Sequence, residues 1–164
     1  LSKRNAQGLT ITVKGNTLTL EGIMLRCFIT NYGYNITLKG DVRARVKQEN
    51  RGPNVYTHNL YGSSKILTDT NDLTKHTYLL HDSACLKIGG TVSADTCEIF
   101  AYDNSTVLTQ VGCTAIIYDT AEAITTTSDA KIYAYDNSTV FSWLKPSEDD
   151  KNIHLFDNAK RYNY

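Results

Sequence analysis

Three Asp residues recur in the second half of the chain, and paired carboxylates are the groups that glycosidases use as acid, base or nucleophile. Asp103, Asp119 and Asp136 are 16 and then 17 residues apart. Each follows a Tyr and precedes Asn or Thr, a context typical of turns in which Asp bonds the backbone. We therefore expect each Asp to cap its own turn, and we expect no catalytic residue among them.

The Cys and His residues do not have the spacing of a metal or nucleophile site. The four Cys include no C-x-x-C pair, and the four His include no H-x-x-x-H pair. A nucleophile elbow, a Walker loop and a dinucleotide fingerprint are also missing. Cys97 and Cys113 are 16 residues apart, which favours a buried ladder of free thiols over a disulfide. We expect no metal, no cofactor and no enzymatic activity, and free thiols imply assembly in a reducing compartment.

Aromatic and aliphatic side chains recur at positions that we expect to face outward, and an outward apolar stripe needs a partner. Three explanations compete: a sister subunit of a homo-oligomer covers the stripe, the N-terminal segment covers it, or the Tyr residues stack the sugars of a surface glycan. A fourth is that the inside and outside of one sheet are reversed. We favour the homo-oligomer, as a trimer. The candidate residues are Tyr102, Tyr118, Tyr135, Phe100, Ile116, Tyr133 and Trp143.

A second candidate surface is basic, and its charges alternate along one expected strand and the loop after it. A basic stripe of this kind can meet nucleic acid or another protein. No nucleic-acid-binding motif accompanies it, so a solvated face is the simpler interpretation and we do not expect a nucleic-acid partner. The residues are Lys39, Arg43, Arg45, Lys47 and Arg51.

An internal repeat indicates which strands and turns carry these residues. The sequence Ala-Tyr-Asp-Asn-Ser-Thr-Val occurs identically at residues 101–107 and 134–140, with a weaker copy at 117–123. The underlying unit has eight residues, in which the third is small, the fifth apolar and the seventh small or β-branched. Alternate residues share one face of a strand, and the Asp-Asn start is a turn signal. Each unit is therefore predicted to be one strand and one turn.

One such unit cannot bury its apolar stripe, so the units must stack. Two units per coil give about 16 residues and predict an all-β, right-handed parallel β-solenoid with coils ~4.8 Å apart. We expect the solenoid over residues 82–143 and a cap or tail over 144–164. Residues 1–81 form a basic β segment in which 16–20 and 35–38 are candidate degenerate coils, and 48–63 are the expected loop.

The amino-acid composition agrees with a β architecture and argues against a membrane-inserted protein. The 164 residues include 21 Thr, 11 Tyr and 2 Pro, which favours strands. Basic and acidic residues cancel at 17 each, but residues 1–51 carry 9 basic and 3 acidic side chains, and residues 82–150 carry 3 and 11. No apolar run approaches the ~18–20 residues that cross a bilayer, so we expect no membrane insertion. The start at Leu1, without a signal peptide, predicts an excised or processed fragment.

The units at residues 101–107 and 134–140 resemble the tandem A-Y-D-N-S-T-V octapeptide arrays of bacterial and bacteriophage proteins. The resemblance covers roughly residues 82–143 and implies a β-solenoid used as a stalk, fibre or display surface in virion appendages or on cell surfaces. It carries no catalytic residue across. We therefore expect a non-enzymatic structural or binding module. The alternatives are a carbohydrate-binding or carbohydrate-processing β-helix, and a binder of protein or nucleic acid through the basic segment.

Overall fold

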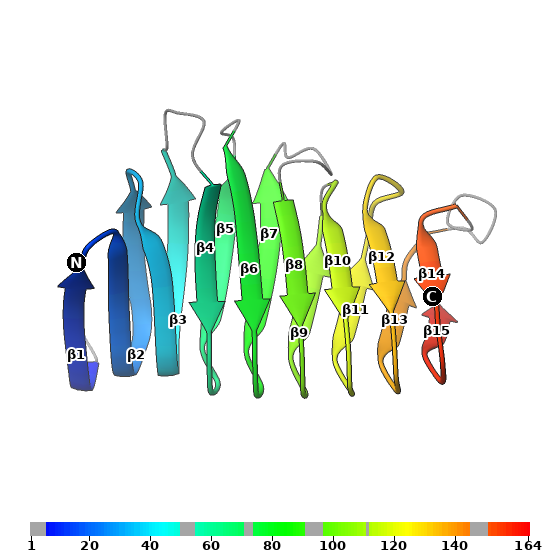
Figure 1. Ribbon diagram of the computed structural model, residues 1–164, viewed down its shortest axis with the longest axis horizontal. Helices are drawn as coiled ribbons and strands as arrows, with labels where there is room; N and C mark the ends of the chain where they lie inside the picture. Colours follow the sequence, from blue (N-terminus) through cyan, green and yellow to red (C-terminus); the bar gives the residue numbers. More distant parts are fainter. Residues whose placement is uncertain (1–5, 50–54, 71–73, 91–96, 111, 145–150) are drawn as a thin grey trace.

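The computed structural model describes residues 6–49, 55–70, 74–90, 97–110, 112–144 and 151–164, and their regular structure is entirely β (Figure 1). The first three strands are β1 (Ala6–Lys14), β2 (Thr17–Asn31) and β3 (Asn35–Gln48). Shorter strands follow in pairs: β4 (Val55–Leu60), β5 (Lys65–Thr70), β6 (Lys75–Leu80), β7 (Cys85–Gly90), β8 (Cys97–Ala101), β9 (Thr106–Thr109), β10 (Thr114–Ile117), β11 (Glu122–Thr125), β12 (Lys131–Ala134), β13 (Thr139–Ser142), β14 (Ile153–Leu155) and β15 (Lys160–Asn163).

The paired strands form a parallel β-solenoid, as the repeat predicts. The solenoid is flattened into two rows of strands and has about six turns. The front row contains β4, β6, β8, β10, β12 and β14, and the back row contains β5, β7, β9, β11, β13 and β15 (Figure 1). From N- to C-terminus the chain descends in the nearer row and rises in the farther one, which makes the coil right-handed (Figure 1). Adjacent coils pair parallel and in register, so Glu98, Thr114 and Lys131 form one column.

The coils are longer than the predicted 16 residues, at a spacing of roughly 20. The register gives 16 residues from Glu98 to Thr114 and 17 from Thr114 to Lys131, but 21 from Ile132 to Ile153. Four-residue turns join the strands of each coil at one edge, whereas the loops at the other edge vary from 4 residues before β10 to 10 before β14. The octapeptide period therefore describes only the shortest coils.

The stack extends beyond residues 82–143 in both directions. The candidate degenerate coils pair in register, Thr17 with Asn35 and Leu20 with Leu38. Residues 48–63 are not one loop, because Val55–Leu60 forms β4. At the other end, β14 and β15 add a further coil in the segment expected to be a cap or tail. This coil was hidden from the sequence pattern by the long loop that precedes it.

A glycine bend lets one long strand supply both rows of the early coils. Thr37 and Leu38 of β3 pair with β4, whereas residues 43–48 pair with β5. Between them lies Gly40, whose φ is 85°, and a Cβ added there would stand 2.4 Å from the carbonyl oxygen of Gly22. Only glycine fits so close an approach with positive φ. Before this coil, β1 pairs antiparallel with β2.

The core is a thin layer of the inward positions that the repeat predicts. Positions three, five and seven of the octapeptide are buried in every unit from 97 to 142, so the assignment of inside and outside was correct for both rows. Cys97 and Cys113 are buried at equivalent inward positions, and all four cysteines are free thiols. Burial raises the pKa of the Cys113 thiol to about 12, which keeps it protonated and unreactive.

The turn Asp residues hold neighbouring coils together, which differs from the predicted cap on their own turns. Asp82, Asp103, Asp119, Asp136 and Asp157 all have left-handed backbone, with φ between 54° and 58°. In each, Oδ2 accepts a hydrogen bond from the backbone N–H at the equivalent position of the preceding coil, at 2.8–3.4 Å. Asp tolerates this backbone conformation better than most residues and also supplies the acceptor.

Substitutions of Asp119 should separate the cross-coil hydrogen bond from the backbone conformation. Asp119→Asn keeps an acceptor and tolerates positive φ, so the free energy of unfolding should change by less than about 0.5 kcal/mol. Asp119→Gly should lower it by about 1 kcal/mol through the lost hydrogen bond. Asp119→Ala should lower it by about 2 kcal/mol, because Ala also carries the strain of left-handed backbone. Urea unfolding followed by circular dichroism measures all three.

The control is Asp129→Ala. Asp129 is an exposed loop residue and is not one of the five turn Asp residues, here called the Asp row; its hydrogen bond to Thr127 Oγ1 comes from its backbone N–H, which the substitution keeps. It should leave the free energy of unfolding within about 0.5 kcal/mol of the unsubstituted chain. If Asp119→Asn proved as damaging as Asp119→Ala, the charge and not the acceptor would hold the coils together.

Candidate functional site

The turn edge carries a continuous stack of six aromatic rings, here called the aromatic ladder. Neighbouring ring centroids are 4.6–5.2 Å apart with interplanar angles of 5–14°. The structure brings together the predicted Tyr102, Tyr118 and Tyr135 and adds three rings that the Tyr-Asp motif missed. The ladder consists of Tyr61, His81, Tyr102, Tyr118, Tyr135 and Phe156. A looser pattern of aromatic, Asp or Gly, polar and small residue finds all six.

Because the rings stack on one another, the ladder presents their edges and not their faces to solvent. A sugar packs against the face of an aromatic ring, and within the ladder those faces are already in contact with other rings. Partial burial, with Tyr102 and Tyr135 on either side, raises the pKa of Tyr118. This geometry favours a role in holding the coils together over the sugar-stacking role considered from the sequence.

Next to the ladder, a second row of side chains forms what we call the apolar column. Leu79, Phe100, Ile116, Tyr133 and His154 occupy one register position of the front row, and each is half-buried by its neighbours. Tyr133 and His154 stack with centroids 4.8 Å apart. Trp143, the last of the candidate interface residues, lies at the other edge of the coil, where the repeat places it. It follows β13 of the back row, is 61% exposed and stacks on Tyr164.

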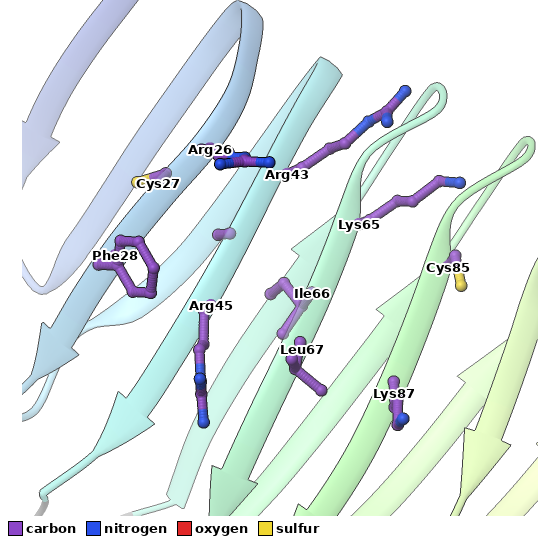
Figure 2. Close-up of a pocket in the computed structure, with 11 residues that line it drawn as sticks. Arg26, Cys27, Phe28, Arg43, Arg45, Lys65, Ile66, Leu67, Cys85 and Lys87 are labelled. Carbon is purple, nitrogen blue, oxygen red and sulfur yellow. The ribbon is translucent and has the colours of Figure 1, made fainter. Parts of the chain in front are cut away.

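The back row carries a basic surface depression, the basic hollow, with a volume of about 480 Å³ (Figure 2). It lies over four neighbouring strands, β2, β3, β5 and β7, and combines cations with apolar side chains. The cations are Arg26, Arg43, Arg45, Lys65 and Lys87, and the other lining residues are Cys27, Phe28, Ala44, Ile66, Leu67 and Cys85.

The structure divides the five basic residues predicted from the sequence. Arg43 and Arg45 line the hollow, where Arg43 pairs with Asp41 at 3.1 Å and Arg45 with Asp69 at 3.0 Å. Lys47 pairs with Glu49, whose hydrogen bond raises the pKa of the lysine. Lys39 lies beyond the bend at Gly40, 4.0 Å from Glu21, and Arg51 lies outside the described residues.

The sequence pattern did not identify three cations of the hollow, Arg26, Lys65 and Lys87, as part of a basic surface. They belong to different coils, so only the register of the folded chain places them beside Arg43 and Arg45. Among the residues that the structure describes, these three have no carboxylate within ion-pair distance.

A buried pair of histidines forms a polar chain inside the early coils. The Ile36 N–H donates to Nδ1 of His58 at 3.1 Å, so neutral His58 carries its proton on Nε2. That nitrogen lies 3.0 Å from Nδ1 of His76, whose Nε2 lies 2.9 Å from Oγ1 of Thr74. Burial, and secondly His76, lowers the pKa of His58 to about 3. No group of three or more side chains that could hold a metal ion occurs among the described residues.

His58 should make the protein less stable in weak acid. Its pKa is about 3 when folded and 6.5 ordinarily, so below about pH 6.5 the unfolded state binds an additional proton. Stability is then lost as the pH falls, by about 1.4 kcal/mol between pH 7.5 and 5.5. Urea unfolding at the two pH values measures this, and the loss should shrink strongly in His58→Leu.

His58→Leu is expected to lower the free energy of unfolding at both pH values. The quantity compared between variants is therefore the difference between pH 7.5 and pH 5.5 within each one. The matched control is His81→Phe, which keeps a ring in the ladder and should lose the same 1.4 kcal/mol, within about 0.3 kcal/mol, as the unsubstituted chain. An undiminished pH effect in His58→Leu would show that the acid sensitivity arises elsewhere.

The fold and these surfaces define a β-solenoid repeat protein, and comparison does not narrow the class further. No protein-family model, no curated protein and no solved structure matches the chain. In the part of the chain that the structure describes, no helix is long and apolar enough to cross a membrane.

Proposed function

We propose that the chain is a non-enzymatic structural and binding module that serves as a stalk or display surface, in a phage tail fibre or spike or in another virion or cell-surface protein. The observation that carries the proposal is the use made of the turn side chains. Asp, Tyr and Ser residues that could do chemistry instead join one coil to the next or close the turn itself. Four free thiols, three of them buried, support assembly in a reducing cytoplasm before display.

The Asp row has features that disfavour the carbohydrate-processing alternative. Coils ~4.8 Å apart place successive Asp residues near the ~5 Å separation of retaining glycosidases. A glycosidase, however, needs two carboxylates in different environments, so that one is protonated while the other is charged. Asp103, Asp119 and Asp136 share one backbone conformation and the same cross-coil hydrogen bond. Equivalent carboxylates of this kind suit a repeating structural role.

We also propose that the front face packs against copies of this chain in a homo-oligomer, with a trimer favoured. The apolar column runs over at least four coils from Phe100 to His154, and the aromatic ladder lies directly beside it. A continuous outward stripe of this composition is the kind of surface that proteins bury in an interface. The straight, regular front row allows the same contact to repeat along the axis of the solenoid (Figure 1).

Light scattering coupled to size-exclusion chromatography tests the oligomer. The unsubstituted chain should elute with three times the mass of a single chain of 18.3 kDa. Ile116→Lys places a charge in the middle of the apolar column and should yield monomers, with an unchanged circular dichroism spectrum.

Asn137→Lys is the control, because it adds the same charge at an exposed turn position away from the apolar column. It should leave the trimer intact. A monomeric unsubstituted chain at micromolar concentration would rule out the interface, and equal dissociation by both variants would show that net charge alone weakens the assembly.

A further inference from the structure

We propose that the basic hollow binds an anionic polysaccharide, one that carries sulfate or carboxylate groups along its length. The site lies on the back row, whereas the proposed oligomer interface lies on the front row (Figures 1 and 2). The inference therefore goes beyond the proposed function and does not depend on it.

The hollow has more positive charge than its own carboxylates can balance. Its five cations face two acidic partners, Asp41 and Asp69. The Arg45–Asp69 pair is half exposed, and an exposed pair of this kind is weak enough to exchange partners with a ligand. Arg26, Lys65 and Lys87 leave at least three donors for anionic groups. The segment that supplies Arg26, Arg43 and Arg45, residues 1–51, has an excess of six positive charges with these three included, so the sequence around them is basic as well.

Within the hollow, cations and apolar side chains alternate along the axis of the solenoid. Phe28 pairs with Arg45, Arg45 with Leu67, and Leu67 with Lys87, so one column reads apolar, cationic, apolar, cationic. A parallel column places Arg43 beside Lys65. With strands ~4.8 Å apart, four strands give a site roughly 14 Å across. Figure 2 shows the charged groups of Arg26, Arg43 and Lys65 at one side of the hollow and those of Arg45 and Lys87 at the other.

This alternation fits a polysaccharide better than it fits other polyanions. An acidic polysaccharide presents the C–H faces of its rings between sulfate or carboxylate groups, so it can pack on Phe28 and Leu67 while the cations bind its charges. Single-stranded nucleic acid binds through rows of aromatic residues on which its bases stack. Among the described residues, Phe28, which is 66% exposed, is the one aromatic residue that lines the hollow.

The test measures the affinity of the full chain for four probes by isothermal titration calorimetry at 150 mM NaCl. The probes are a heparin-derived dodecasaccharide, an oligogalacturonate, a neutral glucan of equal length and a single-stranded oligonucleotide of equal charge. Binding of the sulfated or the carboxylated glycan, with no binding of the neutral one, supports the proposal. Failure of both anionic glycans, or tighter binding of the oligonucleotide, overturns it.

A matched pair of double variants locates the site. Lys65→Gln with Lys87→Gln should weaken glycan binding at least tenfold and reduce the slope of log affinity against log salt concentration by about two. Lys131→Gln with Lys160→Gln makes the same charge change on the distant strands β12 and β15, and should stay within twofold of the unsubstituted chain. Equal losses in both variants would mean that binding follows net charge and not the hollow.

Phe28→Ser tests the apolar part of the site separately. It should weaken glycan binding several-fold without altering the salt slope, since it removes ring contact but no charge. Unchanged affinity would overturn the role given to the alternating column. The solution mass of each variant, measured alongside, should equal that of the unsubstituted chain, so a failed glycan experiment and a failed oligomer experiment remain distinguishable.

Discussion

One carboxylate oxygen per coil, accepting the backbone N–H of the coil before it, fixes how the solenoid stacks. The bond joins residues 16–21 positions apart in sequence and repeats from Gly62 to Asp157. Together with backbone hydrogen bonds between the same turns, such as Thr120 N–H to the Asp103 carbonyl, it constrains the height and rotation of each turn, and the aromatic residue before the Asp lies directly over its equivalent. The parallel ladders of both rows then continue from a turn whose register is already determined.

Part of the charge asymmetry of the chain comes from the residue that occupies one column of the stack. In the later coils Asp occupies the left-handed position and leaves a row of exposed carboxylates. In the earlier coils Gly22, Gly40 and Gly62 occupy the corresponding column, where a Cβ would approach a carbonyl oxygen to 2.4–3.0 Å. Glycine brings no charge, so the outward Arg and Lys residues of these coils dominate their surface. The basic hollow and the acidic edge thus lie at different ends of one continuous stack.

The repeat determined the architecture because strand pairing depends on a pattern that a single sequence displays. Small, apolar and β-branched residues at alternate positions established which side chains are inside, and Ala115, Ile117 and Ala121 are fully buried as expected. The Tyr-Asp spacing likewise located three rings of the aromatic ladder. Where loops lengthen the coil, the pattern lost its period, so the coil containing Phe156 and Asp157 was not found. Residue types alone did not reveal that Asp bonds across coils, since a local cap and a cross-coil bond call for the same side chain.

The local unit, its inward face and its stacking into a right-handed solenoid could therefore all be predicted from the order of the residues. Tertiary structure alone decided which residues from different coils become neighbours. Arg26, Lys65 and Lys87 gather around Arg43 and Arg45, and His58 meets His76, only once the loop lengths have set the register. The physical reason is that a period of two fixes the side of the sheet on which a residue lies, whereas its neighbours depend on the length of every loop between them.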